Sequence, residues 1–537
     1  MRRIQSRVNT QSETFKANRE HNLRLRDELR EKLHDARSVR PQRDIKRLRD
    51  QGKLLVRERL ELLLDPGTPF LELSALAANQ ADHEGRYGGH IKGAGMVTGI
   101  GVVNGREVMV VANDSSIKGG AVYPLGAKKT IRALKIALEN RLPVVHLVDS
   151  AGAYLPMQME IFHEGGHLFY HLCRLSAAGV EQVAVALGHC TAGGAYVPTL
   201  SDYSIMVRGT SGVFLGGPPL VKAATGEDIG AAELGGADVH TSISGTADYA
   251  VDSEEQGIAM AREIVGLQRS RDKQLADRRA PEEPYYDPQE LYGIIPADIK
   301  QQFDMREVIA RLVDGSLFHE YKPDYGTTLV CGYAYLWGYK IGILANNGVL
   351  FSEAARKATN FMELCDRDGV PVLFLHNITG FMIGRDYEHN GITKDGAKML
   401  MVQSNLRVPK FSVLCHASFG AGNYAMAGRG YEPNFLFAWP HSQCATMGAE
   451  QAAKTLSQIK LAALKREGKT LDPAAMQGIH DQIHSDYTRS NSVYYQTSEL
   501  RDDGVIDMVD TRNALGIALS AALNAPLPER QQGILRI

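Results

Sequence analysis

Two clusters of small residues in this chain could stabilise an oxygen atom that gains negative charge during a reaction. One cluster runs from Thr191 to Tyr196 and the other from Ser418 to Tyr424. Each follows an apolar run and precedes a helix-like stretch, so backbone N–H groups can point into a cavity beside a helix N-terminus. Donors of this kind stabilise an oxyanion in the transition state. The residues that we predict to be catalytic are Gly193, Gly194, Ala421 and Gly422.

The two clusters lie at matching places in an internal repeat. Pro143 and Pro371 begin similar apolar runs at a shift of 371 − 143 = 228, and the same shift takes Gly194 to Gly422. For either cluster alone, close helix–strand packing that only glycine permits is the simpler explanation. Because both clusters keep the same offset from matching strands, we favour a functional explanation, with two similar backbone pockets in one chain.

The rest of the repeat predicts the elements that position these clusters. Residues 105–113 and 338–346 are matching strand patterns, displaced by 338 − 105 = 233, and helix patterns follow at 127–140 and 352–367. Buried strand-like runs that alternate with amphipathic helices are typical of an α/β fold with mostly parallel pairing.

A chain of 537 residues is expected to form more than one domain. Prolines near residue 280 predict an extended linker, because proline lacks an N–H donor and biases its predecessor away from helix. The expected parts are a helical arm (1–52), an N-terminal domain (53–278), a linker (279–297) and a C-terminal domain (298–537).

Composition excludes several classes of protein. With 60 basic and 62 acidic residues, the net charge of −2 gives no reason to expect nucleic acid or an anionic membrane as a partner. No apolar run reaches the roughly 18–20 residues of a membrane span. The six cysteines are scattered, which predicts neither a disulfide framework nor a zinc site, and we expect no metal.

The N-terminal residues bear on the cellular location. Glu13 and Glu20 interrupt the basic start, so a cytoplasmic location is favoured over the mitochondrial matrix.

No familiar protein base or nucleophile is evident. The chain has no Ser-His-Asp order, no nucleophile elbow and no H-E-x-x-H motif. His163, His167 and His171 have helical spacing, but Gly165 and Gly166 lie between them and predict a weak helix or a shortened loop. Two oxyanion pockets without a protein base suit chemistry in which a substrate or cofactor supplies the base.

At this point the motifs match a known family. The chain resembles the β subunit of biotin-dependent acyl-CoA carboxylases of the 3-methylcrotonyl-CoA and geranyl-CoA type, from about residue 50 to its end. The motifs that carry the resemblance are Ile117-Lys-Gly-Gly-Ala-Val-Tyr-Pro124, Asp149-Ser-Ala-Gly-Ala-Tyr-Leu-Pro156, Cys190-Thr-Ala-Gly-Gly-Ala-Tyr196, Phe214-Leu-Gly-Gly-Pro-Pro-Leu-Val-Lys-Ala-Ala-Thr-Gly226, Ala345-Asn-Asn-Gly-Val-Leu-Phe-Ser-Glu353, Asn377-Ile-Thr-Gly-Phe-Met-Ile-Gly-Arg385 and Phe419-Gly-Ala-Gly-Asn-Tyr424.

The resemblance implies two tandem crotonase-like (ββα-superhelix) domains, the first binding acyl-CoA and the second receiving carboxybiotin. The active site is expected between the N domain of one subunit and the C domain of another. CO₂ released from N-carboxybiotin would reach the γ-carbon of a 3-methyl enoyl thioester after the biotin ureido nitrogen removes the γ-proton. The two glycine-containing pairs would hold the thioester oxygen and the ureido oxygen, and the sequence leaves open which serves which.

Further residues are expected to bind the substrate by position in the family motifs. They are Gly119, Gly120, Ala151, Gly152, Ala153, Gly165, Tyr196, Gly217, Pro218 and Phe381.

The resemblance also implies partners. The chain has no Ala-Met-Lys-Met biotinylation site, since Gly396-Ala-Lys-Met399 is not one, and no Gly-rich ATP-grasp loop. A separate α subunit is therefore expected to carry biotin carboxylase, which uses ATP and bicarbonate, and the biotin carrier. The family's usual assembly predicts a β hexamer within an α6β6 complex.

One departure from the family bears on the substrate. Methylcrotonyl-type sequences usually have an aromatic residue eleven positions before the position of Ser176, whereas this chain has Gly165 (176 − 11 = 165). If this segment lines the acyl pocket, the absence of the aromatic side chain leaves space in the pocket. A geranyl tail could then enter that space. We therefore favour geranyl-CoA over 3-methylcrotonyl-CoA. The alternatives are a crotonase-like hydratase or isomerase, the carboxyltransferase subunit of a decarboxylase, and a scaffolding subunit with vestigial pockets.

Overall fold

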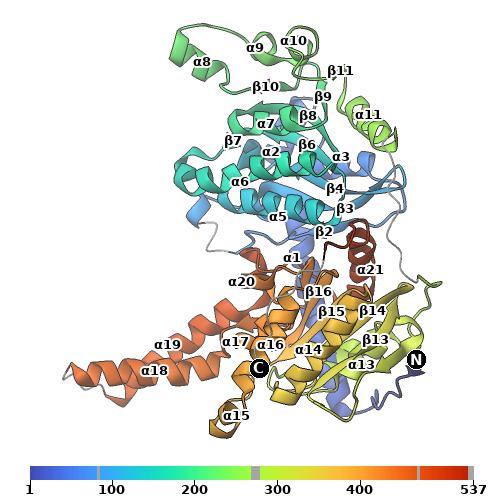
Figure 1. Ribbon diagram of the computed structural model, residues 1–537. Coiled ribbons are helices and arrows are strands. Elements are labelled where there is room, and N and C mark those ends of the chain that lie inside the picture. The colour runs from blue at the N-terminus through green and yellow to red at the C-terminus, as the bar shows by residue number, and fades with distance from the viewer. Residues whose placement is uncertain (81–84, 268–277, 468–471, 530–537) are drawn as a thin grey trace.

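Two mixed β-sheets, one in each half of the chain, form the framework of the protein (Figure 1). The computed structural model describes residues 1–80, 85–267, 278–467 and 472–529. Figure 1 shows the N-terminal half, coloured blue to green, above the C-terminal half, coloured yellow to red. Helices alternate with the strands along the chain, which confirms the predicted α/β class.

The first sheet has the strand order β11-β9-β8-β6-β4-β3-β2, with β10 beside β8. Its β2, β3 and β4 pair antiparallel, and β4, β6, β8, β9 and β11 pair parallel. The bounds are β2 (Leu71–Leu73), β3 (Met96–Val103), β4 (Arg106–Asn113), β6 (Val144–Ser150), β8 (Gln182–Thr191), β9 (Tyr203–Val207), β10 (Gly212–Phe214) and β11 (Tyr249–Val251). A separate two-stranded ladder joins β5 (Ala121–Val122) to β7 (Gly152–Ala153).

The second sheet repeats this order as β12-β13-β14-β15-β16-β17-β19, with β18 beside β16 and with the N-terminal strand β1 added at the β12 edge. The bounds are β1 (Arg2–Arg3), β12 (Leu317–Glu320), β13 (Leu329–Leu336), β14 (Tyr339–Asn346), β15 (Val372–Ile378), β16 (Lys410–Phe419), β17 (Phe435–Ala438), β18 (Gln443–Ala445) and β19 (Gly504–Val505).

The strand register confirms the internal repeat. In the first sheet Val144 on β6 pairs with Gln182 on β8, and in the second Val372 on β15 pairs with Lys410 on β16, so both partners move by 228. Both ladders also shift register near their ends. Ser150 pairs with Cys190 there, and 228 residues later Ile378 pairs with Ser418. The duplication therefore includes the irregularity that precedes each small-residue cluster.

Helices cover the sheets at matching places. The two predicted helix patterns form α5 (Pro124–Asn140) and α14 (Ser352–Arg367). Each carries a buried lysine, Lys129 or Lys357, that donates to the first carbonyl of a strand, at 2.8 Å to Met96 O and 2.9 Å to Leu329 O. Because the two lysines differ in number by 357 − 129 = 228, this polar anchor between helix and sheet is duplicated as well.

Further helices complete each half and connect the two. In the N-terminal half they are α3 (Val56–Leu63), α6 (Gln158–Ala177), α7 (Tyr196–Leu200), α8 (Pro218–Thr225), α9 (Ala231–Gly235), α10 (Ala237–Ser242) and α11 (Glu254–Leu267). In the C-terminal half they are α12 (Leu291–Ile294), α13 (Met305–Ala310), α15 (Arg385–His389), α16 (Ile392–Ser404), α17 (Gly420–Ala425), α18 (Ala449–Arg466), α19 (Pro473–Asn491), α20 (Val493–Ser498) and α21 (Thr511–Ala522). Within the described ranges, no helix combines the length and apolar character that crossing a bilayer requires.

The N-terminal segment ties the halves together. It forms α1 (Glu13–Ser38) and α2 (Gln42–Asp50). On α1, Asn22 Nδ2 donates at 2.9 Å to the carbonyls of Tyr292 and Ile295 in the C-terminal half. Farther along, Arg37 pairs with Glu72 of the N-terminal half at 2.7 Å. One helix therefore contacts both halves.

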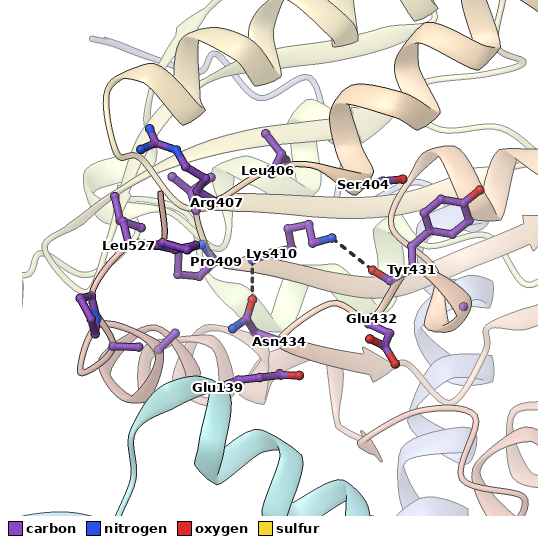
Figure 2. A pocket seen from close by; sticks show the side chains of 16 residues that line it. Glu139, Ser404, Leu406, Arg407, Pro409, Lys410, Tyr431, Glu432, Asn434 and Leu527 are labelled. Carbon is purple, nitrogen blue, oxygen red and sulfur yellow. Dashed lines mark hydrogen bonds between the residues drawn. The ribbon is translucent and has the colours of Figure 1, made fainter. Parts of the chain in front are cut away.

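A buried ion pair joins the two halves directly. Arg132 on α5 contacts both carboxylate oxygens of Asp503 at 2.8 Å and donates to the Asn434 carbonyl at 2.9 Å. Arg429 adds a contact to Asp503 at 2.9 Å, and these guanidinium groups hold the pKa of that carboxyl far below its usual value despite burial. A cavity of about 600 Å³ lies beside this joint (Figure 2). In it Lys410 donates to the Tyr431 carbonyl, and the Asn434 side chain accepts from the Lys410 N–H.

Removing one partner of a buried ion pair leaves the other charge unpaired, which typically costs about 3–5 kcal/mol. We expect Asp503→Asn to lower the free energy of unfolding by about 3 kcal/mol near neutral pH, measured by urea denaturation. The control is Glu432→Gln, which breaks the more exposed pair with Lys135 and should cost about 0.5 kcal/mol. Equal effects of the two substitutions would show that the Asp503 joint does not stabilise the protein in this way.

Candidate active site

A cavity of about 700 Å³ in the N-terminal half brings together six of the residues predicted to act on substrate. The end of β6, the helix α6 and the turn after β8 enclose it, and most of its lining is apolar. The six predicted residues that line it are Gly152, Ala153, Gly165, Gly193, Gly194 and Tyr196. Two distant motifs and one helix therefore meet at a single space.

The turn that carries Gly193 and Gly194 begins where β8 ends. Residues Ala192–Ala195 form one turn of 3-10 helix, and α7 follows at once. The N–H groups of the first helical turn have no acceptor within the helix. Both glycines line the cavity, so this first helical turn borders the space where a ligand would bind.

The same turn is repeated in the C-terminal half. There β16 ends at Phe419, and Ala421 and Gly422 lie in the first turn of α17. The residue that starts each turn has a left-handed backbone conformation, with φ 53° at Ala192 and φ 59° at Gly420. Left-handed backbone is unfavourable for residues other than glycine. The N-terminal turn therefore keeps this conformation despite an alanine.

Close packing also requires glycine in these turns. A Cβ added to Gly194 would lie 3.2 Å from both Cβ and Oγ of Ser150, and one added to Gly422 would lie 2.5 Å from Cγ1 of Ile378. Ser150 and Ile378 are themselves related by the 228 shift. The packing explanation and the oxyanion explanation are thus compatible, because glycine lets the turn approach the neighbouring strand while its amides stay unshielded.

The expectation of a weak helix or shortened loop at Gly165 and Gly166 is wrong. α6 runs unbroken through both glycines, because tertiary packing outweighs their low helix propensity. A Cβ on Gly165 would approach only Ile161 Cγ2, at 3.9 Å, and one on Gly166 would meet nothing within 4 Å. The helix therefore presents side-chain-free backbone to the cavity, and the cavity is larger for it.

A second cavity, of about 590 Å³, adjoins the first through Ser150. It contains two more predicted residues, Gly119 and Ala151, and it is lined by the basic side chains of Arg47 and Lys53. Lys53 Nζ contacts Asp149 at 2.9 Å, and the buried Arg59 contacts Asp149 at 3.3 Å. Asp149 is thus neutralised from two sides, and the pair of cavities joins an apolar space to a polar one.

Gly120 supports this arrangement without lining either cavity. Its φ is 78°, and a Cβ there would lie 2.1 Å from the Asp149 carbonyl oxygen. Only glycine allows the loop to approach the end of β6 this closely.

The remaining predicted residues lie elsewhere. Gly217 and Pro218 cap and begin α8, outside the lining of both cavities. Phe381 is in the C-terminal half, where Leu350 bridges to it and Gly396 packs on its ring. Ala421 and Gly422 are likewise in the C-terminal half, so one chain carries its two turns in two different sheets.

Several lining residues escaped the sequence analysis. His146, Ser150 and Asn113 line the first cavity together with Phe169, and Arg47 lines the second. The period-two alternation along β6 was the available signal, because it places His146 and Ser150 on one face of the strand.

Among the described residues, no group of three or more His, Cys, Asp or Glu side chains is arranged to hold a metal ion.

Comparison with known proteins gives a consistent result. A family model described as the carboxyl transferase domain matches residues 47–535. The chain is 47% identical over 517 residues to the biotin-dependent 3-methylcrotonyl-coenzyme A carboxylase beta1 subunit of Mycobacterium tuberculosis, covering 96% of this chain and 97% of that one. It is 46% identical over 539 residues to the mitochondrial methylcrotonoyl-CoA carboxylase beta chain of Arabidopsis thaliana, covering 99% and 91%. Among solved structures, the beta subunit of geranyl-CoA carboxylase from P. aeruginosa superposes with a TM-score of 0.87 at 41% identity, covering 99% of each chain.

The left-handed turns give a paired stability prediction. Gly420→Ala should lower the free energy of unfolding by about 1–2 kcal/mol, because alanine is strained at positive φ. Ala192→Gly relieves the same strain but gains unfolded-state entropy, so it should change stability by less than about 0.5 kcal/mol. Urea denaturation measures both, and Gly430→Ala, with ordinary φ and nothing within 4 Å of the new Cβ, is the control. A harmless Gly420→Ala substitution would contradict the assigned turn geometry.

Proposed function

This chain belongs to the family of proteins with a carboxyl transferase domain, and we propose that it moves CO₂ from N-carboxybiotin to the γ-carbon of a 3-methyl-branched enoyl-CoA. It is the carboxyltransferase subunit of a biotin-dependent acyl-CoA carboxylase, built from two tandem crotonase-like domains. The observation that carries the proposal is the duplicated turn, which offers one pair of backbone amides in each half. Two such pairs suit a reaction in which two carbonyl groups must be held.

The acyl chain fits the apolar cavity of the N-terminal half. Its thioester oxygen would accept hydrogen bonds from the N–H groups of Gly193 and Gly194, where negative charge develops as the γ-proton leaves. Once the acyl chain fills this mostly apolar cavity, the lower local polarity strengthens each hydrogen bond. We therefore assign the thioester to the N-terminal pair.

The polar part of coenzyme A fits the second cavity. Arg47 brings positive charge to it, as the phosphate groups of coenzyme A require, while Lys53 is paired with Asp149. Ser150 lines both cavities and so marks the place where a thioester would pass from one to the other.

The C-terminal pair, Ala421 and Gly422, is then left for the ureido oxygen of biotin. The fit is supported by the exposure of Ala421 at the start of α17, where a carrier on another subunit can approach. When bound, N-carboxybiotin supplies both the CO₂ and a nitrogen that can accept the γ-proton. This assignment agrees with the first cavity, whose described lining contains no carboxylate that could act as a base.

Partner subunits follow from the same chemistry. Beta subunits of this family work with a biotin-carrying alpha subunit. We propose that this chain also associates with itself, so that the N-terminal turn of one copy faces the C-terminal turn of another. Large exposed apolar side chains occur near both turns and support such a contact: Met159, Phe162 and Tyr196 in the N-terminal half, and Ile383 and Tyr424 in the C-terminal half. A hexamer within an α6β6 complex remains part of the proposal.

Geranyl-CoA is the substrate that we favour over 3-methylcrotonyl-CoA. Gly165 and Gly166 remove side chains from the wall of the acyl cavity, at a helix position where glycine lowers stability by about 1 kcal/mol per residue. A destabilising residue is reasonable here if the space it provides is used. A second activity, that of a hydratase or isomerase, is disfavoured because a carboxylate base is absent from the described cavity lining.

Fixation of labelled bicarbonate by the purified complex of this chain with its α subunit tests both the activity and its substrate. We expect ATP-dependent incorporation with a higher kcat/KM for geranyl-CoA than for 3-methylcrotonyl-CoA. Gly165→Phe should lower kcat/KM for geranyl-CoA by about tenfold or more and affect the shorter substrate less, because the ring fills the space that the longer tail needs. The control is Gly165→Ala, whose methyl group reaches only Ile161. If Gly165→Phe still uses geranyl-CoA normally, the glycine does not set the tail length.

The second cavity gives an independent prediction. Arg47→Gln should raise KM for the acyl-CoA by about tenfold with little change in kcat, because a phosphate contact far from the reacting atoms is lost. Arg43→Gln, on the same helix but 90% exposed, is the matched control and should leave KM unchanged. Initial rates over a range of acyl-CoA concentrations measure both. An unchanged KM in Arg47→Gln would place coenzyme A elsewhere.

A further inference from the structure

Three buried polar side chains are linked by hydrogen bonds across the C-terminal turn. Asn423, within α17, donates from Nδ2 to the Ser418 hydroxyl at 2.8 Å. The same hydroxyl lies 2.9 Å from Nδ1 of His376 on β15, and all three side chains are buried. The hydrogen bond between Ser418 and Asn423 closes the chain around residues 419–422. These residues include the pair of amides that we assign to the ureido oxygen.

The three side chains can satisfy one another without any charge. Burial lowers the pKa of the His376 ring to about 3, and an interaction with the Met426 backbone opposes this only in part. The ring is therefore neutral near pH 7, and one of its nitrogens is an acceptor. Since a hydroxyl can accept and donate at once, Ser418 can accept from Asn423 and donate to Nδ1 of His376. Buried hydrogen-bond networks that are satisfied in this way make a site rigid.

The Ser418–His376 pair does not act on a substrate. Neither side chain has exposed surface, so a ligand cannot reach the hydroxyl or the ring. Its contacts run to Asn423 instead, which directly follows Gly422 in the chain. The side-chain hydrogen bond therefore restrains the backbone on both sides of the turn.

The N-terminal half uses apolar packing at the matching positions. The 228 shift relates His376, Ser418 and Asn423 to Val148, Cys190 and Ala195. These three counterparts are buried together in one apolar cluster. The Cys190 thiol lies 3.6 Å from the Gly188 carbonyl on its own strand, so this contact does not span the turn. Because the same turn forms on apolar residues in one half, the fold does not require polar side chains in the other.

We propose that these linked side chains, the polar brace (His376, Ser418 and Asn423), hold the C-terminal pair of amides in the geometry that binds the ureido oxygen of biotin. The proposal rests on the proposed function and adds three positioning residues to it. Donors that stabilise developing charge are effective when they are fixed before the reaction. The brace fixes this turn from two neighbouring strands, since His376 belongs to β15 and Ser418 to β16.

The test uses the reverse of the proposed step, catalysed by the full-length β chain with free biotin as the acceptor. The γ-carboxyl leaves carboxylated geranyl-CoA or carboxylated 3-methylcrotonyl-CoA as CO₂, the biotin nitrogen takes up this CO₂, and the proton of that nitrogen passes to the γ-carbon. We expect Asn423→Ala and Ser418→Ala each to lower kcat/KM for biotin about tenfold or more, because the amides are displaced. KM for the acyl-CoA should stay within about twofold, because its site is in the other half.

Two further variants separate positioning from a general loss of stability. The double variant of Asn423→Ala and Ser418→Ala should be no worse than the worse single one, since both changes remove the same hydrogen bond. The control is Thr511→Val, which breaks the buried 2.8 Å hydrogen bond from Trp439 in the same half and should leave both kinetic parameters unchanged. Thermal unfolding verifies that each variant is folded. If an alanine variant does not fold, Ser418→Cys takes its place, because a thiol is nearly the same size and a weaker acceptor.

The outcomes distinguish this proposal from the proposed function. Unchanged kinetics for biotin, or an equal effect on biotin and on the acyl-CoA, overturns the positioning role. If the wild-type chain transfers carboxyl from neither thioester, the proposed function fails, and amide hydrogen exchange decides the brace. Exchange in residues 419–425 should be faster in Asn423→Ala, with residues 191–197 unchanged. The same exchange in the variant and the wild type would show that the brace does not hold the turn.

Discussion

The structure depends on a constraint at the end of two strands, where the chain must turn through a left-handed residue and begin a helix at once. Ala192 and Gly420 provide that residue after β8 and β16. The turn exposes the first helical amides beside the end of the preceding strand, and this position allows them to stabilise an oxyanion. The matching register shift near the end of the paired strand accompanies the turn in both halves, so the sheet and the turn have been duplicated as one unit.

The two halves share their backbone but differ in the polarity of the side chains beside the turn. Asp149, held by Lys53, corresponds to Asn377, which contacts Gln302. His146 corresponds to Phe374, and Ser150 to Ile378. At these three positions the N-terminal half is the more polar one, as suits a site for a thioester with a charged carrier, whereas Val148 corresponds to the more polar His376. The shared backbone gives two similar turns, and we propose that the side chains beside them select different ligands.

The joint between the halves limits how these two sites can cooperate. Arg132 and Asp503 hold α5 against the C-terminal sheet through a buried, bidentate contact, and α1 contacts both halves. The two turns of one chain lie in separate sheets, and the joint holds these sheets against each other. Exposed apolar residues such as Phe162 and Ile383 then offer surfaces on which another copy can complete the site. Association is thus the proposed means of bringing two carbonyl groups together.

The sequence by itself determined the repeat, the α/β class, the two helices α5 and α14 and the family, because these depend on local pattern and on motif residues. It located Gly193, Gly194 and Gly165, which the fold places around one cavity. It did not foresee that α6 continues through Gly165 and Gly166, since packing of the helix overrides their low propensity. Nor did it single out His146 or Ser150, whose place in the cavity lining arises only when β6 and α6 enclose a space. Which side chains share a cavity is decided by contacts between distant segments, and local pattern does not contain that information.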